Sequence, residues 1–233
     1  MIDWHSHILP AVDDGSRSLE ESLTMLNALW AQGVDLVMAT PHFYANLTTV
    51  DDFLVKRDEA YATLAPHLGK EHPRVMCGAE VRYYSGISQM QGLGRLTLGN
   101  TNLLLLEMPM NRWTEYTIQE LLTLASTRGL RIVMAHIERY LSYQGKGVIE
   151  RLIENGFLMQ VNASFFGGLG TRHKALQMLS SGKIHMIGSD CHNMTSRPPK
   201  IERAYELIER KFGEHFVFQM TDFGYAILGH SKK

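Results

Sequence analysis

Short apolar runs alternate with amphipathic stretches along the whole chain. Amphipathic stretches predict helices over residues 19–32, 50–65, 114–128, 147–155, 172–181 and 199–212. Residues 83–101 are glycine-rich and irregular, which predicts a loop or a hairpin. The apolar runs have the length and composition of strands that are buried on both faces, and they cover residues 1–7, 34–40, 75–81, 102–107, 131–136, 157–162 and 185–189.

The helix boundaries carry local signals. Ser18 followed by Glu21 is a capping box at the start of the first helix, and Gly33 marks its end. Four further glycines each follow a predicted helix, at positions 129, 156, 182 and 213. Helices that alternate with strands in this way predict a parallel sheet of the α/β class.

Seven such strands can close into a distorted barrel or lie open as a doubly wound sheet. A histidine, a carboxylate or an asparagine ends nearly every strand, Asn162 among them. Barrel enzymes carry their chemistry at the carboxyl ends of the strands, so this placement favours the barrel. No low-complexity segment or linker divides the chain, and we expect one domain over residues 1–233.

The composition excludes several classes of partner. The 233 residues carry a net charge of -1, which argues against a broad basic surface for nucleic acid. No apolar run approaches the ~18 residues of a membrane span, so we expect no membrane insertion. Two cysteines and no apparent signal peptide fit a reducing, cytosolic location.

Residues that bind metal ions recur at the strand ends. His5 and His7 are two apart in a strand and therefore point to the same face. Glu80 and Glu107 end buried strands, where a carboxylate needs a partner. The full set of candidate ligands is His5, His7, Asp14, His42, Glu80, Glu107, His136, Asp190 and His192.

Mixed histidine and carboxylate ligands suit zinc, manganese or iron better than calcium or magnesium. Nine candidates exceed one tetrahedral site, so they indicate a cluster of two or three ions with a bridging carboxylate. Arg139 and Arg197 follow two of the same strand ends, and the forked donors of arginine fit a phosphate.

A second kind of chemistry is compatible with one motif. Cys191 precedes Arg197 by the spacing of thiol-based phosphatases. The intervening residues include no glycine for a phosphate cradle, and the carboxylate of Asp190 would raise the thiol pKa. This alternative is therefore weak, and Cys77 is interpreted as a core residue.

Several motifs together resemble one known family. They are DWHSHILP at 3–10, DDGS at 13–16, ATPH at 39–42, GAE at 78–80, AHIERY at 135–140, SDCHN at 189–193 and RPP at 197–199. In this order they resemble the bacterial protein-tyrosine phosphatases of the PHP (polymerase and histidinol phosphatase) type, the CpsB/YwqE family of polysaccharide-export operons. Trp4 and Ala11 depart from the pattern, where the family has a smaller apolar residue and a glycine.

The resemblance implies a distorted (β/α)7 barrel with three divalent ions, manganese first, with iron or zinc as alternatives. It implies that Arg139 and Arg197 bind phosphate. The implied substrate is a phosphotyrosine protein, the tyrosine-rich tail of a cognate kinase that regulates polysaccharide synthesis. By the family pattern, one ion has His5, His7, Glu80 and Asp190, a second has Glu80, Glu107 and His136, and a third has Asp14, His42 and His192.

Three other functions remain open at this point. Another phosphoesterase of the same superfamily, such as a histidinol-phosphate phosphatase or a nuclease, would use the same ligands. A non-catalytic phosphotyrosine-binding or metal-binding module would not need so complete a ligand set. An amidohydrolase-like enzyme usually has a metal-bridging lysine at a strand end, and none of the predicted strand ends has one.

Overall fold

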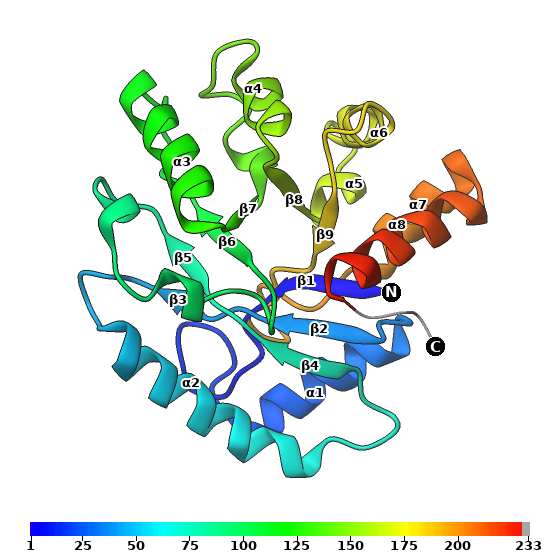
Figure 1. Ribbon diagram of the computed structural model, residues 1–233. Coiled ribbons are helices and arrows are strands. Elements are labelled where there is room, and N and C mark those ends of the chain that lie inside the picture. Colours follow the sequence, from blue (N-terminus) through cyan, green and yellow to red (C-terminus); the bar gives the residue numbers. More distant parts are fainter. Residues whose placement is uncertain (230–233) are drawn as a thin grey trace.

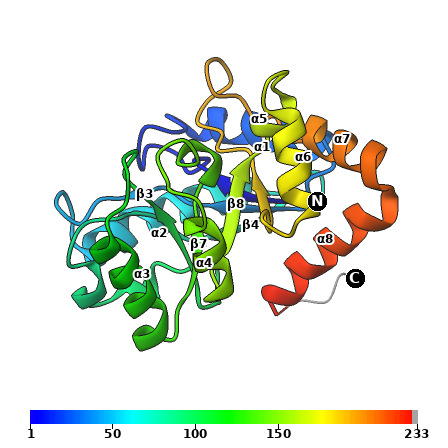
Figure 2. The same cartoon turned by 90° about the horizontal axis from the view of Figure 1, so that it is seen from above.

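The computed structural model describes residues 1–229 as a layered α/β fold, in which helices surround a parallel sheet (Figures 1 and 2). The strands are β1 (Ile2–Ser6), β2 (Leu36–Ala39), β3 (His42–Phe43), β4 (Arg74–Cys77), β5 (Glu80–Arg82), β6 (Leu103–Glu107), β7 (Arg131–Met134), β8 (Leu158–Asn162) and β9 (Met186–Gly188). The helices are α1 (Leu19–Ala31), α2 (Val50–Leu64), α3 (Glu115–Arg128), α4 (Val148–Glu154), α5 (Ser164–Gly167), α6 (Arg172–Ser180), α7 (Glu202–Phe212) and α8 (Glu214–Ile227).

The strands form two sheets that continue into each other. One has the order β1-β2-β4 and the other β3-β5-β6-β7-β8-β9, and the strand pairs are parallel. The chain passes from the first sheet to the second after Ala39 and again after Cys77. At the other edge, the carbonyl oxygen of His5 accepts a hydrogen bond from the backbone N–H of Asp190, just past β9, at 2.8 Å. The result is a curved, barrel-like parallel sheet.

The prediction of a single strand over 75–81 is wrong. Glu80 begins β5, and β4 and β5 lie in different sheets. The break falls at Gly78, where an added Cβ would lie only 2.7 Å from Cδ2 of Leu98. Only a glycine fits at this point, and two residues later Glu80 pairs with His42 on the neighbouring strand β3.

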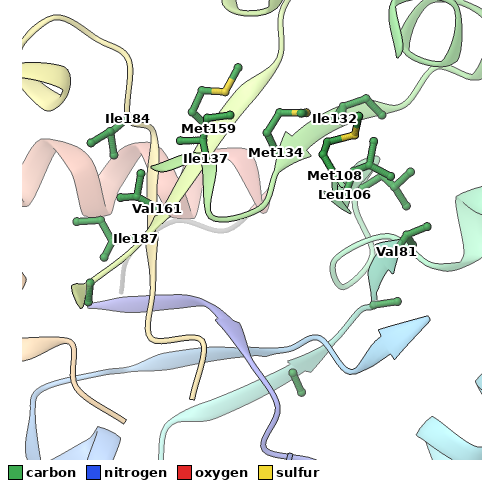
Figure 3. Close-up of a cluster of buried hydrophobic side chains, with 14 of the residues drawn as sticks. Val81, Leu106, Met108, Ile132, Met134, Ile137, Met159, Val161, Ile184 and Ile187 are labelled. Carbon is green, nitrogen blue, oxygen red and sulfur yellow. The ribbon is translucent and has the colours of Figure 1, made fainter. Parts of the chain in front are cut away.

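Both faces of the central strands are buried, as predicted. In β6, Leu104 and Leu106 belong to the cluster under the helices, which includes the side chains of Figure 3. Leu103 and Leu105 belong to a second cluster, on the inner side of the sheet. Tyr225 of helix α8 and Leu228 just after it add to this inner cluster, so the alternating side chains of β6 fill two cores.

The predicted helices are confirmed with one shifted start and two omissions. Ser18 accepts from the backbone N–H of Glu21 as a capping box requires, whereas the Glu21 carboxylate accepts from Arg17. Helix α7 begins at residue 202 and not at 199, because Oε1 of Gln32 accepts from the backbone N–H groups of Ile201 and Glu202. The short helix α5 and the long helix α8 were not predicted, and residues 83–101 hold only two short 3-10 turns.

Candidate metal centre

The nine predicted ligands come from six separate segments, and the structure brings them to one end of the sheet. His5 lies in β1, and His7 and Asp14 follow this strand. His42 and Glu80 begin the adjacent strands β3 and β5, whereas Glu107 ends β6. The remaining ligands, His136, Asp190 and His192, follow β7 and β9.

The two histidines of the first strand point to the same place, as their spacing predicts. Nε2 of His5 and Nε2 of His7 are 3.2 Å apart. The same two atoms lie 3.2 and 3.4 Å from Oε2 of Glu80. Oδ1 of Asp190 lies 3.8 Å from His5 and 3.5 Å from His7. Four ligand-type side chains thus face one small volume.

Glu80 is the centre of the cluster. Its side chain is 1% exposed, and Oε1 lies 2.9 Å from Nε2 of His136. Burial alone would raise the pKa of Glu80, but the charge of His5 and the hydrogen bond from His136 bring it well below its usual range. The carboxylate therefore stays ionised although it is buried, and its two oxygens face different histidines.

Three sets of side chains offer ligand atoms within 4.8 Å of one another. His5 and Glu107 each belong to one set, whereas His7 and His42 each belong to two. Shared members are what a cluster of neighbouring ions needs. The sets are His7, Asp14, His42 and His192; His5, His7 and Asp190; and His42, Glu80 and Glu107.

Several buried ligand atoms have no hydrogen-bond partner. They are Nδ1 of His42, Oε2 of Glu80, Oε2 of Glu107 and Nε2 of His192. Nδ1 of His42 lies 2.9 Å from Oε2 of Glu80, yet this pair does not have the geometry of a hydrogen bond. Buried polar atoms are normally paired, so this concentration of unpaired donors and acceptors fits side chains that bind a cation.

The charge state of the histidines fits the same interpretation. Burial, then His7 and Arg197, lowers the pKa of His192 to about 4, which leaves a neutral imidazole as metal binding requires. Burial alone would lower the pKa of His7, but the hydrogen bond with Asp13 and the nearby carboxylates of Asp190 and Glu80 bring it well above 6.5. Positive charge is thus favoured at His7, and a divalent ion supplies such charge.

Buried polar side chains hold the histidines in place. Asp13 Oδ2 lies 2.6 Å from Nδ1 of His7. Oε1 of Gln160 accepts from the backbone N–H of His136 at 2.7 Å and lies 3.2 Å from Nδ1 of His5. Tyr140 places its hydroxyl 3.0 Å from Nδ1 of His136. The contacts of Asp13 with Nδ1 of His7 and of Gln160 with Nδ1 of His5 leave Nε2 of both histidines directed at the cluster. Outer partners of metal ligands act in the same way.

Sequence reasoning missed Asp13, Gln160 and Tyr140 as functional residues. Asp13 lies in the loop before the first helix and accepts from the backbone N–H of Gly15 at 3.0 Å, as an ordinary turn residue does, so its position carries no distinct functional signal. A glutamine in the middle of an apolar strand was the available signal for Gln160, because a buried amide requires partners.

Two of the candidate ligands have a left-handed backbone. The φ angles are 31° at His136 and 53° at Asp190. Residues other than glycine adopt such angles at a cost of order 1–3 kcal/mol, and they concentrate at functional sites. The turn at each of these strand ends directs a ligand-type side chain into the cluster.

Both predicted phosphate-binding arginines contact Asp190. Nη2 of Arg139 lies 2.5 Å from Oδ2, and Nη2 of Arg197 lies 2.8 Å from Oδ1. Each arginine side chain is more than a third exposed, at 35% for Arg139 and 38% for Arg197. They are therefore fixed beside the cluster and remain open to solvent on one side, where an anion can reach them.

The thiol alternative has no support in the structure. Cys191 is fully buried, and burial followed by the charges of Asp3 and Asp190 raises the pKa of its thiol far above its usual range. A reactive cysteine requires a lowered pKa and access to solvent. Cys77, whose thiol pKa burial raises to about 11, is likewise inert.

Comparison with known proteins agrees with this geometry. The sequence pattern of the family described as "Capsular polysaccharide synthesis, CpsB/CapC" matches residues 1–222. The chain belongs to the CpsB/CapC family. The resemblance seen in the motifs is thereby confirmed.

Two curated relatives cover nearly the whole chain. The tyrosine-protein phosphatase CpsB of Streptococcus agalactiae serotype III is 32% identical, over 94% of both chains. The tyrosine-protein phosphatase YwqE of Bacillus subtilis is 31% identical, over 95% of this chain and 89% of the relative.

A solved structure has the same fold. It is described as that of YwqE from Bacillus subtilis and CpsB from Streptococcus pneumoniae, unique metal-dependent tyrosine phosphatases. It superposes with a TM-score of 0.83 at 26% identity, over 100% of this chain and 96% of the other.

Within residues 1–229, no helix is long and apolar enough to cross a bilayer.

Proposed function

We propose that this protein is a metal-dependent protein-tyrosine phosphatase, which hydrolyses phosphotyrosine in a protein substrate. The observation that carries the proposal is the meeting of nine histidine and carboxylate side chains from six segments, with unpaired ligand atoms buried among them. Family membership and the names of the relatives point to the same reaction.

The ligands would be the nine predicted residues, and the fold a distorted (β/α)7 barrel of the PHP type. We propose three divalent ions, manganese in the first place, with iron or zinc as alternatives. Which residues share an ion stays a prediction, since His7 and His42 each reach two neighbouring sets. Bound divalent ions would lower the pKa of water and neutralise the charge of a phosphate.

The residues of the chain itself would orient and bind the substrate. Arg139 and Arg197 lie on one side of the cluster, where their forked donors suit the non-bridging oxygens of a phosphate. Binding there would compete with the contacts of both arginines to Asp190. Tyrosine is a good leaving group for such a site because its hydroxyl has a pKa of about 10.

The proposed partner is the tyrosine-rich tail of a cognate kinase, and the proposed setting is the regulation of polysaccharide synthesis in the cytosol. The family description names capsular polysaccharide synthesis, which supports this setting. A flexible tail suits a site whose arginines lie partly exposed at the rim.

The test is phosphate release from a phosphotyrosine peptide, compared with a phosphoserine peptide and histidinol phosphate. Each reaction is run with added manganese and again after chelation, on protein without an N-terminal tag because His5 is close to the terminus. Release that favours phosphotyrosine and stops after chelation supports the proposal. A preference for histidinol phosphate contradicts the assignment to phosphotyrosine, and release that survives chelation contradicts the metal dependence.

A further inference from the structure

A hollow of about 440 Å³ opens directly beside the candidate metal centre. It lies between the loop after β1, the loop after β3 and the first turns of α2. We call it the His42 hollow. Its walls include Val12, Asp14, His42, Tyr44, Leu47 and Phe53.

The hollow has one polar wall and several apolar walls. Asp13, Asp14 and His42 form the polar wall, and the last two belong to a set of candidate metal ligands. Val12 and Phe53 are almost fully buried at 8% and 4% exposure, whereas Leu47 is 74% exposed. A ligand that enters would therefore have its polar end at the metal ligands and its apolar part against these side chains.

Tyr44 adds an aromatic wall. Its ring stacks on the imidazole of His42, with the centroids 5.2 Å apart and the planes at 28°. Lys56 fixes the opposite side, because its Nζ donates to the carbonyl oxygen of Val12 at 2.8 Å and so ties α2 to the loop after β1. Two lining side chains, those of Tyr44 and Lys56, thus have defined partners within the wall.

The predicted phosphate-binding side adjoins this hollow. Nη1 of Arg197 lies 4.0 Å from Oδ2 of Asp14. Asp14 therefore borders both the guanidinium of Arg197 and the apolar walls. In phosphotyrosine a single ester oxygen separates the phosphate from the phenyl ring, so the ring must occupy a surface that adjoins the phosphate site.

We propose that the His42 hollow binds the phenyl ring of the phosphotyrosine, and that Leu47 and Tyr44 are specificity-determining residues. This inference rests on the proposed phosphatase function and names the part of the site that would select an aromatic ester. Apolar side chains gain free energy by covering a ring, whereas the short stem of phosphoserine would leave the hollow unfilled.

A neighbouring hollow provides the control. It measures about 300 Å³ and is lined by Ala45, Asn46, Arg82, Tyr83 and Tyr84. None of the nine candidate ligands lines it. Tyr84 is 37% exposed there, so it is a large, partly exposed rim residue of a hollow that contains no candidate metal ligand.

The experiment compares Leu47→Asn with Tyr84→Asn on phenyl phosphate and ethyl phosphate, in manganese-loaded protein. Leu47 is exposed, so its replacement leaves the fold intact. We expect Leu47→Asn to lower kcat/KM for phenyl phosphate about five- to tenfold, which corresponds to losing roughly half of the free energy of burying a leucine side chain. The same variant should change kcat/KM for ethyl phosphate less than twofold. Tyr84→Asn should change neither. Equal losses on both esters, an equal loss in Tyr84→Asn or no loss in Leu47→Asn would overturn the ring site.

A binding measurement separates this inference from the function on which it rests. Phenylphosphonate and methylphosphonate are not hydrolysed, so their affinities for the manganese-loaded protein need no turnover. We expect the unmodified protein to bind phenylphosphonate more tightly than methylphosphonate. Leu47→Asn should reduce the ratio of these two affinities about five- to tenfold. If neither ester is hydrolysed, the phosphatase function is wrong, and if the two phosphonates bind alike, the ring site is wrong.

Discussion

Oδ2 of Asp13 lies 2.6 Å from Nδ1 of His7 and also accepts from the backbone N–H of His42 at 2.8 Å. One carboxylate therefore positions two candidate metal ligands that come from different strands. It also stays ionised, because hydrogen bonds from His7 outweigh burial and hold the pKa of Asp13 well below its usual range.

Replacing Asp13 by asparagine should weaken metal binding. The amide cannot stabilise the imidazole of His7 as a carboxylate does, and changes to such outer partners typically cost 10–100-fold in metal affinity. Titration of metal-free protein with manganese measures the effect. Asp222→Asn, on an exposed position of α8, is the control. Equal affinity in the two variants would show that Asp13 does not position a ligand.

Gln160→Leu should affect both stability and metal binding. The substitution leaves the buried backbone N–H of His136 without its acceptor, which costs about 1–3 kcal/mol of unfolding free energy. The substitution also removes the contact between Oε1 of Gln160 and Nδ1 of His5, so the imidazole of His5 is no longer held in its orientation. Urea unfolding without metal measures the first effect and manganese titration the second, with the exposed Gln177→Leu as control. A metal affinity that matches the control would contradict a positioning role.

Cys191→Ala should leave the activity within about twofold, because the thiol is buried and protonated. Phosphate release from the phosphotyrosine peptide is the readout, and His136→Ala provides the comparison that should lose activity. An inactive Cys191→Ala protein that still binds its metal would instead make the thiol the nucleophile.

The positions of the strands and of most ligands followed from the sequence, because an apolar run that ends in a histidine or carboxylate is a strong local pattern. His5, Glu107 and Asp190 were found in this way. The passage of the chain from one sheet to the other was not predictable from such patterns. At Gly78, where β4 and β5 separate, the side chain of Leu98 leaves no room for a Cβ, and this contact joins residues 20 positions apart.

Long-range contacts also explain the other differences. The start of α7 is set by Gln32, which lies about 170 positions earlier in the chain. Likewise Gln160 acts on His5 and His136 through contacts that no spacing rule records. The residues that bear the chemistry were therefore predictable, whereas most of the residues that orient them were not.

His185 should make stability depend on pH. Burial, then the charge of Arg131, lowers its pKa in the folded protein, and Nδ1 accepts from the backbone N–H of Met159 at 3.0 Å. The unfolded chain has the ordinary histidine pKa of about 6.5. Below that pH the unfolded state takes up a proton that the folded state does not, so the unfolding free energy falls, by at most about 1.4 kcal/mol per pH unit.

The variant His185→Asn isolates this effect, since the amide oxygen keeps an acceptor and does not titrate. Urea unfolding of metal-free protein between pH 5 and 8 is the measurement. The difference in unfolding free energy between the unmodified protein and His185→Asn should be constant above pH 7. As the pH falls toward 5, the variant should become more stable relative to the unmodified protein. Parallel curves over the whole range would assign the pH dependence to other groups.

Ala11→Gly should not destabilise the protein, although glycine usually does. Ala11 has a φ of 57°, in the left-handed region where alanine costs about 1–2 kcal/mol and glycine does not. The greater freedom of glycine in the unfolded chain offsets about 0.4–1 kcal/mol of that gain. Ala28→Gly, within α1, should instead lower the unfolding free energy by about 1 kcal/mol. Equal losses in both variants would contradict strain at Ala11.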